Sequence, residues 1–95
     1  MIVDSFGFYL FQLGMYQKIN EKIKVAGVYK DYTFQPFKFL WNGRQLKIDK
    51  ITLVSNVRNG LIKKRFYSVM IGSDIYRLLF DRESEIWTID EVWVD

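Results

Sequence analysis

The most constraining feature of the sequence is the dipeptide Asn42-Gly43, which joins two runs of alternating apolar and polar residues. Asn-Gly between such runs is the strongest short-range signal for a β-hairpin with a type I′ turn. A two-residue loop predicts four cross-strand pairs, which are Trp41 with Arg44, Phe39 with Leu46, Lys38 with Lys47 and Phe37 with Ile48. One face of this hairpin is therefore apolar, and the other carries two facing lysines.

The composition suits a small folded domain and restricts its chemistry. Of the 95 residues, 49% are hydrophobic and 18% aromatic, which is enough for a dense core in a chain that buries only about two-thirds of its unfolded surface. The chain contains no cysteine and no histidine, so disulfides, thiolate metal sites and the commonest general base are excluded. The absence of cysteine suits a reducing compartment, and we expect the protein in the cytoplasm.

The charges are distributed unevenly along the chain. Residues 16–65 carry twelve Lys and Arg against three acids, whereas residues 66–95 carry two Arg against seven acids. Two interpretations remain open. Either the halves neutralise each other across paired strands, or the basic half presents a basic face to a partner.

Short β-rich runs separated by turn residues predict an all-β fold. Six strands are expected, at residues 23–29, 37–41, 46–57, 62–71, 75–81 and 87–94. They form an antiparallel meander, which must bend or close into a small barrel to cover its large aromatic residues. Within the first strand, Gly27 predicts a bulge or a close backbone approach, and Pro36 is expected at the head of the second.

The third expected strand changes the parity of its apolar residues. Leu46 and Ile48 are in phase with each other, whereas Ile51 and Leu53 are one residue out of step. An extra residue at position 49 or 50 restores the facing, which is typical of a β-bulge that bends a long strand. We therefore expect Ile48 and Ile51 both to face the core.

Three later turns set the remaining registers. A turn at Asn59-Gly60 pairs Val57 with Ile62, Val54 with Arg65, Leu53 with Phe66 and Ile51 with Ser68. A three-residue loop at residues 72–74 pairs Phe66 with Phe80 and Met70 with Tyr76. A turn at residues 82–85 pairs Phe80 with Trp87, Leu78 with Ile89 and Arg77 with Asp90.

The N-terminal segment is treated as a separate unit, residues 1–15, ahead of a single β domain at residues 16–95. Residues 1–14 are apolar but too short to span a bilayer, and they lack the basic start and cleavage site of a signal peptide. They form either an added strand or a loosely attached leader, and Met1 and Met15 are both candidate starts. The spacing of Met15, Ile19 and Ile23 predicts one or two helical turns.

Several segments together resemble a known group of proteins. These are EKIKV at residues 21–25, PFKFLWNGR at 36–44, KITLV at 50–54, YRLLFD at 76–81 and WTIDEVW at 87–93. They resemble small bacterial proteins of unknown function, some of which stand beside or are fused to Y-family translesion polymerases. The resemblance covers residues 21–95 and implies a β domain that acts near DNA transactions. Its motifs are those of a fold, so it implies no catalytic residues.

The sequence does not favour an enzyme. A hydrolytic triad needs a base such as His beside Ser or Cys. Asp81, Glu83 and Glu85 cluster within five residues. Glu83 and Glu85 are expected on a solvated turn, which offers little burial to raise the pKa of a carboxyl group, and the cluster lacks the glycine and the spaced acids of a calcium loop. We therefore expect no catalytic activity, no cofactor, no metal and no small-molecule substrate.

The basic residues and one tryptophan provide the candidate binding site. Trp41 beside Arg44 is either an indole capped by a cation or a base-stacking platform next to a phosphate contact. Lys38 and Lys47 are like charges across a ladder, and a bend would bring three further cations near them. The predicted nucleic-acid-binding residues are Lys38, Lys47, Lys63, Lys64, Arg65, Arg44 and Trp41. Trp87 and Trp93 are expected on one strand face, with Trp87 in the core and Trp93 exposed.

Two functions of different class follow from these features. The first is a nucleic-acid-binding accessory domain in DNA repair or translesion synthesis that holds DNA or RNA through backbone phosphates. The second is a protein-interaction module that docks on a polymerase or another larger enzyme through exposed apolar residues or an open strand edge. A membrane partner is not expected.

Overall fold

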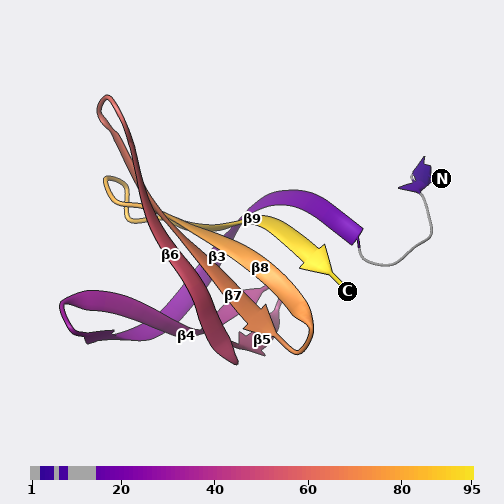
Figure 1. Ribbon diagram of the computed structural model, residues 1–95, viewed down its shortest axis with the longest axis horizontal. Coiled ribbons are helices and arrows are strands. Elements are labelled where there is room, and N and C mark those ends of the chain that lie inside the picture. Colours follow the sequence, from indigo (N-terminus) through magenta and orange to yellow (C-terminus); the bar gives the residue numbers. More distant parts are fainter. Residues whose placement is uncertain (1–2, 6, 9–14) are drawn as a thin grey trace.

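The computed structural model describes residues 3–5, 7–8 and 15–95, and within these ranges all regular structure is β (Figure 1). The strands are β1 (Val3–Ser5), β2 (Gly7–Phe8), β3 (Met15–Lys30), β4 (Thr33–Trp41), β5 (Arg44–Lys47), β6 (Lys50–Asn59), β7 (Ile62–Ile71), β8 (Asp74–Asp81) and β9 (Trp87–Val94). β1 and β2 pair with each other, and the other seven strands form one antiparallel sheet in the order β5-β4-β3-β9-β8-β7-β6. The predicted all-β class is confirmed, with seven strands in the main sheet rather than six.

The additional strand comes from a break in the predicted third strand, because β5 and β6 lie at opposite edges of the sheet. Between them, the Ile48 amide donates to the Phe37 carbonyl at 2.8 Å and the Asp49 amide donates to the Met70 carbonyl at 2.9 Å. Ile48 is buried and Ile51 packs against the core, as predicted. The chain thus crosses from one edge to the other at residues 48–49, and the sheet curls into a half-barrel.

A buried tyrosine connects the two sides of this half-barrel. Tyr67 on β7 is 0% exposed, and its hydroxyl donates a hydrogen bond to the Phe34 carbonyl on β4 at 2.8 Å. β7 and β4 are separated in the sheet by β8, β9 and β3, so this bond spans the concave side. The buried core consists of Ile23, Phe39, Ile48, Tyr67, Val69, Tyr76, Leu78, Ile89 and Val92.

The two Asn-Gly dipeptides form different turns. Asn42 and Gly43 both have positive φ, 51° and 73°, as a type I′ turn requires. The register predicted from this turn is confirmed for Trp41 with Arg44, Phe39 with Leu46 and Lys38 with Lys47.

At the second Asn-Gly dipeptide the predicted register is wrong. Asn59 pairs with Ile62, so the loop is Gly60-Leu61, with positive φ at its first residue as in a type II′ turn. Val57 therefore faces Lys64 and Val54 faces Tyr67. A further register shift between Ile51 and Leu53 leaves Thr52 as a bulge.

The loop between β7 and β8 has two residues, Gly72 and Ser73, instead of the predicted three. Phe66 consequently lies opposite Leu79 and not opposite Phe80. The prediction assumed that Phe66 faces the core, but its neighbour Tyr67 takes that position. Phe66 lies on the convex face, where the Arg77 guanidinium stacks 3.9 Å from its ring centroid.

A bulge at Asp90 changes the facing of β9. Phe80 pairs with Trp87 and Leu78 with Ile89 as predicted, but Arg77 pairs with Glu91 rather than Asp90. The bulge shifts the alternation by one residue, so Trp87 and Trp93 lie on opposite faces and not on the same face. Trp87 packs on the concave side against Phe80, whereas Trp93 is half-exposed beside Tyr16.

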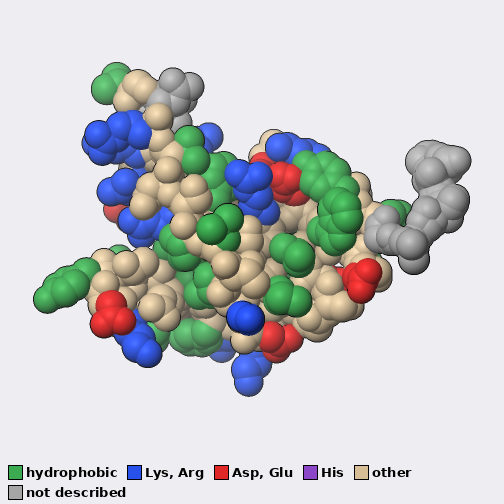
Figure 2. Space-filling view, viewed as in Figure 1, with side chains coloured by type: hydrophobic (Ala, Val, Ile, Leu, Met, Phe, Trp, Pro, Cys, Tyr) green, Lys and Arg blue, Asp and Glu red, His purple; other side chains and the backbone are tan. Residues whose placement is uncertain are grey.

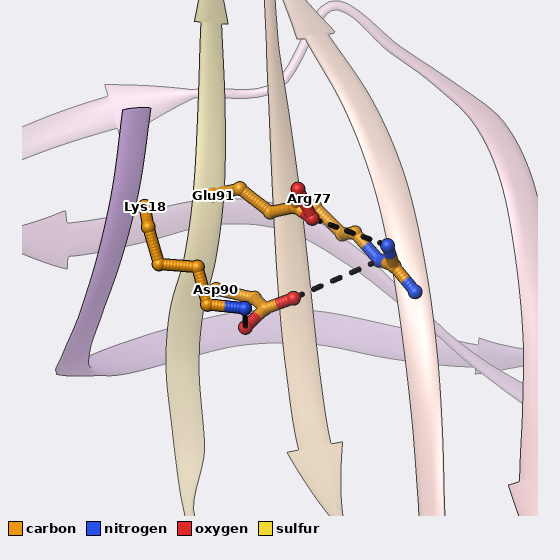
Figure 3. Close-up of polar contacts among 4 residues, drawn as sticks. All are labelled: Lys18, Arg77, Asp90 and Glu91. Atoms are coloured by element: carbon orange, nitrogen blue, oxygen red, sulfur yellow. Dashed lines mark hydrogen bonds and ion pairs between the residues drawn. The ribbon is translucent and has the colours of Figure 1, made fainter. Parts of the chain in front are cut away.

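The Asp90 bulge also organises the ion pairs of the convex face (Figure 3). Asp90 lies 3.2 Å from the Lys18 ammonium and 3.9 Å from Nε of Arg77, and Arg77 Nη1 donates to Glu91 at 3.2 Å. These contacts join β3, β9 and β8. Of these ion pairs, Lys18 with Asp90 joins the basic part of the chain to the acidic part, whereas both contacts of Arg77 lie within the acidic part.

β3 begins at Met15, so the predicted helical turns over Met15, Ile19 and Ile23 are wrong. Pairing with β9 imposes strand geometry on this segment despite its helical spacing. Gly27 makes the close approach that was predicted, because a Cβ there would lie 2.3 Å from the Gln35 carbonyl oxygen. Pro36 lies opposite Gly27 at a bulge inside β4, and not at the strand's head. The predictions for residues 1–2, 6 and 9–14 lie outside the described residues.

We expect Tyr67→Phe to lower the free energy of unfolding by about 1 kcal/mol, which is a fall in Tm of about 4–8 °C. The substitution keeps the buried ring but removes the hydroxyl that donates to the Phe34 carbonyl. Thermal unfolding followed by circular dichroism measures the change. Tyr76→Phe is the matched control, since Tyr76 is also buried and the described residues offer its hydroxyl no hydrogen-bond partner. Equal shifts for the two variants would contradict the role of this bond.

We expect deletion of residues 1–14 to leave a cooperative thermal unfolding transition, because the seven-stranded sheet is built entirely from Met15–Val94. Deletion of residues 1–22 is the comparison, since it removes nearly all of the β3 segment that pairs with β9. The longer deletion should abolish the transition. If the shorter deletion also abolishes it, residues 1–14 belong to the core of the fold.

Candidate nucleic-acid interface

The structure separates the predicted basic residues into two groups. Lys38 and Lys47 pair across β4 and β5. The next residue along β4, Phe39, points into the core, so the two lysines lie on the convex side. The backbone at residue 49, just beyond Lys47, bonds to Met70. Lys63 lies seven residues from Met70 along β7, or about 23 Å. The expected single stripe of five cations is therefore not formed.

Alternation along β7 also divides the three consecutive cations. Arg65 and Lys63 share the concave side with Tyr67, whereas Lys64 lies on the convex side opposite Asp81. On the other edge, Lys38 and Lys24 border a shallow depression that Leu40 and Gln45 also line. Each group of cations thus has its own surroundings.

Trp41 and Arg44 do not form the predicted cation–indole contact. They pair across the hairpin, but the indole Nε1 donates to Glu21 at 2.8 Å and the ring packs edge-on against Tyr76. The cation–π contacts of the described residues are instead Lys38 over Phe37 and Arg77 over Phe66. Trp41 therefore closes one end of the core, which favours the structural interpretation of this residue.

One end of the half-barrel, which we call the mouth, lies where three turns project to the same side (Figure 1). These are the β3–β4, β6–β7 and β8–β9 turns. Arg58 pairs across from Lys63, and the Arg82 amide donates to the Lys63 carbonyl at 2.9 Å. Figure 2 shows blue side chains gathered over the β6–β7 hairpin, at upper left. The cations of the mouth are Arg58, Lys63, Arg65 and Arg82, and the exposed acids Asp31, Glu83 and Glu85 lie on the β3–β4 and β8–β9 turns at the same end.

An aromatic pocket of about 130 Å³ opens beside these cations. Its lining residues come from five strands and are Tyr29, Phe34, Arg65, Tyr67, Phe80 and Trp87. Trp87 is central, with ring centroids at 4.8 Å from Phe80, 5.3 Å from Tyr67 and 5.8 Å from Phe34. Tyr29 is 80% exposed at the rim. Ring surface is therefore offered to a ligand at the mouth.

Arg65 connects the pocket to the basic residues. Its Nε donates to the Asn56 side chain at 2.8 Å, and its Nη1 donates to the Tyr67 hydroxyl at 3.5 Å. These bonds orient the guanidinium at the pocket wall before any ligand arrives. The pocket is smaller than a site for a drug-sized ligand, so it suits a planar ring at the surface rather than an enclosed substrate.

Sequence reasoning found Lys63 and Arg65 but missed Arg58, Arg82 and Tyr29. The signal for Arg58 was present, because placing Gly60 at the first loop position puts Arg58 directly opposite Lys63. Arg82 and Tyr29 join the mouth only through the curl of the sheet. Their positions in sequence give no indication of it.

The acidic turn after β8 is a structural element. The Asp81 carboxylate accepts hydrogen bonds from the amides of Glu83 at 3.0 Å and Ser84 at 3.2 Å. These bonds lower the pKa of Asp81, and the nearby Lys64 lowers it further. Glu83 and Glu85 are exposed, as predicted. Among residues 15–95 no group of three or more acidic side chains is placed to hold a metal ion.

Comparisons with known proteins identify no relative of this chain, so its function is inferred from the geometry of the site. No family model matches the chain, and no curated protein or solved structure matches it. The described part of the chain has no helix that is long and apolar enough to cross a membrane. The resemblance to proteins near translesion polymerases stays a prediction.

We expect Asp81→Asn to reduce the loss of stability in acid. A lowered folded-state pKa means that the carboxylate stabilises the fold above its unfolded pKa of about 3.9, and that this stabilisation is lost as the pH falls through the lowered folded value. Urea unfolding at neutral pH and at about pH 3 measures the effect. Glu83→Gln changes the same charge in the same turn and serves as control. A parent whose stability falls no further than that of Asp81→Asn would contradict this role.

Proposed function

We propose that this chain is a non-catalytic β domain that binds single-stranded DNA or RNA at the mouth, as an accessory to DNA repair or translesion synthesis in the cytoplasm. One observation carries the proposal. Arg65 is held by Asn56 and Tyr67 in the wall of an aromatic pocket, directly beside Arg58 and Lys63. Aromatic surface next to an ordered guanidinium and further cations is the combination that single strands require.

Each part of the mouth has a distinct role in this proposal. Arg58 and Lys63 are exposed and contact backbone phosphates, which supplies affinity without sequence preference. Tyr29 offers an exposed ring on which a base stacks, and its edge-on contact with Phe34 limits its motion. A duplex keeps its bases stacked and unavailable, so the aromatic component favours single strands.

The link to DNA repair is supported by the resemblance of residues 21–95 to proteins that accompany translesion polymerases. Such polymerases act where single-stranded template is exposed. A small domain with no catalytic constellation is suited to holding such a template while a larger enzyme performs the chemistry.

A second candidate is a protein-interaction module that docks on a larger enzyme. It is favoured by the convex face, where Tyr16 and Trp93 are half-exposed with ring centroids 6.2 Å apart. Beside them lies a depression of about 260 Å³ that Ile75 and Arg77 also line. Exposed aromatic and Arg side chains are enriched at protein interfaces.

We expect the parent protein to bind a fluorescent single-stranded oligonucleotide with a log K that falls linearly against log salt. Arg58→Ala/Lys63→Ala should flatten the slope by about 1.4, or about 0.7 for each lost phosphate contact. Fluorescence anisotropy over a range of salt concentrations measures the slope. Lys38→Ala/Lys47→Ala is the matched control, because it removes the same charge from another cross-strand pair.

The control variant should bind as the parent does and be as stable or slightly more stable, since it removes facing like charges from a ladder. If it flattens the slope while Arg58→Ala/Lys63→Ala does not, the convex lysines are the binding surface and the mouth is not. If the parent shows no binding at low salt, the basic residues form only a solvated surface, and the protein-interaction module becomes the preferred function. Tyr29→Ala tests stacking, with an expected loss of about 5- to 150-fold in affinity.

A further inference from the structure

The two edges of the seven-stranded sheet differ in length and character. β5 forms one edge with four residues, and its ends are the exposed cations Arg44 and Lys47. β6 forms the other edge with ten residues. Short charged edges resist pairing, whereas long apolar edges favour it. The β6 edge is therefore the one that is suited to a partner.

β6 exposes apolar side chains on both of its faces. Leu53 is 58% exposed, Val54 41% and Val57 40%. Beyond the Thr52 bulge its ladder with β7 is regular from Leu53 to Asn59, so the outer edge is extended there. No strand of residues 3–5, 7–8 or 15–95 pairs with that outer edge. Its backbone donors and acceptors are free to bond to another strand.

We propose that β6 pairs antiparallel with β6 of a second copy of this chain, around a two-fold axis at Ser55. In this register Leu53 lies opposite the partner's Val57, and Val54 lies opposite the partner's Asn56. Leu53 and Val57 are exposed on the convex side of the same strand. The two-fold axis therefore creates two equivalent contacts between Leu53 of one copy and Val57 of the other.

The charges favour this register over the neighbouring ones. An axis at Val54 would place Arg58 opposite the partner's Lys50, and facing like charges destabilise a ladder. An axis at Asn56 would move Leu53 opposite the partner's Asn59 and lose the apolar pair. With the axis at Ser55, Arg58 faces the partner's Thr52, and no charged side chain faces another.

The dimer has a geometric consequence for the mouth. A two-fold axis perpendicular to the sheet keeps both concave sides on the same side of the joined sheet. Arg58 faces the partner's Thr52, so the two mouths lie at opposite ends of the paired β6 strands, with the two Arg58 residues about 20 Å apart. The pairing goes beyond the proposed function and does not depend on it, because it is measured without nucleic acid.

Sedimentation velocity of the full chain tests the pairing, with a species of twice the 11.4 kDa chain mass expected to grow with concentration. Leu53→Lys/Val57→Lys should lose this species, because lysines then face lysines at both symmetric positions. Leu53→Glu/Val57→Lys should restore it, because each Glu faces the partner's Lys, and added salt should weaken it. Leu61→Lys is the control, at a residue that is 88% exposed at the hairpin tip and away from the axis.

A parent that stays monomeric at every concentration overturns the proposal. So does a Leu53→Glu/Val57→Lys variant that is folded by circular dichroism but monomeric. If Leu53→Lys/Val57→Lys fails to fold, the Glu/Lys variant decides by itself, since a salt-sensitive dimer supports the register and a monomer overturns it. Loss of dimer in Leu61→Lys also contradicts pairing through the β6 edge.

Discussion

The hydrogen bond from the hydroxyl of the buried Tyr67 to the Phe34 carbonyl joins the two sides of the half-barrel. An antiparallel sheet twists, but twist alone does not bring β7 toward β4, which is four places away in the strand order. The bond spans the concave side and satisfies both polar groups. Trp87 packs against both Tyr67 and Phe34 and reinforces the same curvature.

The mouth follows from this curvature. Where the apolar core ends, the rings of Phe34, Trp87 and Tyr67 are left beside the projecting β6–β7 hairpin and its cations. The ion pairs of the described residues lie at the convex seam around Asp90, on the opposite face. One ion pair, Lys18 with Asp90, joins the two charged parts of the chain at this seam, while Arg58, Lys63 and Arg82 of the mouth are exposed.

The sequence was a good guide where a feature depends on neighbouring residues. The Asn42-Gly43 hairpin, the pairing of Phe80 with Trp87 and the close approach at Gly27 were all predictable, because turn chemistry and backbone sterics act over a few residues. It was a poor guide where two local solutions were nearly equivalent. After β7, for example, a loop of three residues instead of two would shift the pairing by one residue, so that Phe66 would lie opposite Phe80 and not opposite Leu79.

The sequence by itself determined the β class, the first hairpin and the presence of a basic half. The tertiary structure alone decided which cations share a surface, because that depends on bulges at Thr52 and Asp90 and on the crossing at residues 48–49. Each of these shifts the alternation or the edge of a strand. Side-chain facing has a period of two, so one extra residue moves a whole segment to the other face, and only packing around Tyr67 selects which face is inside.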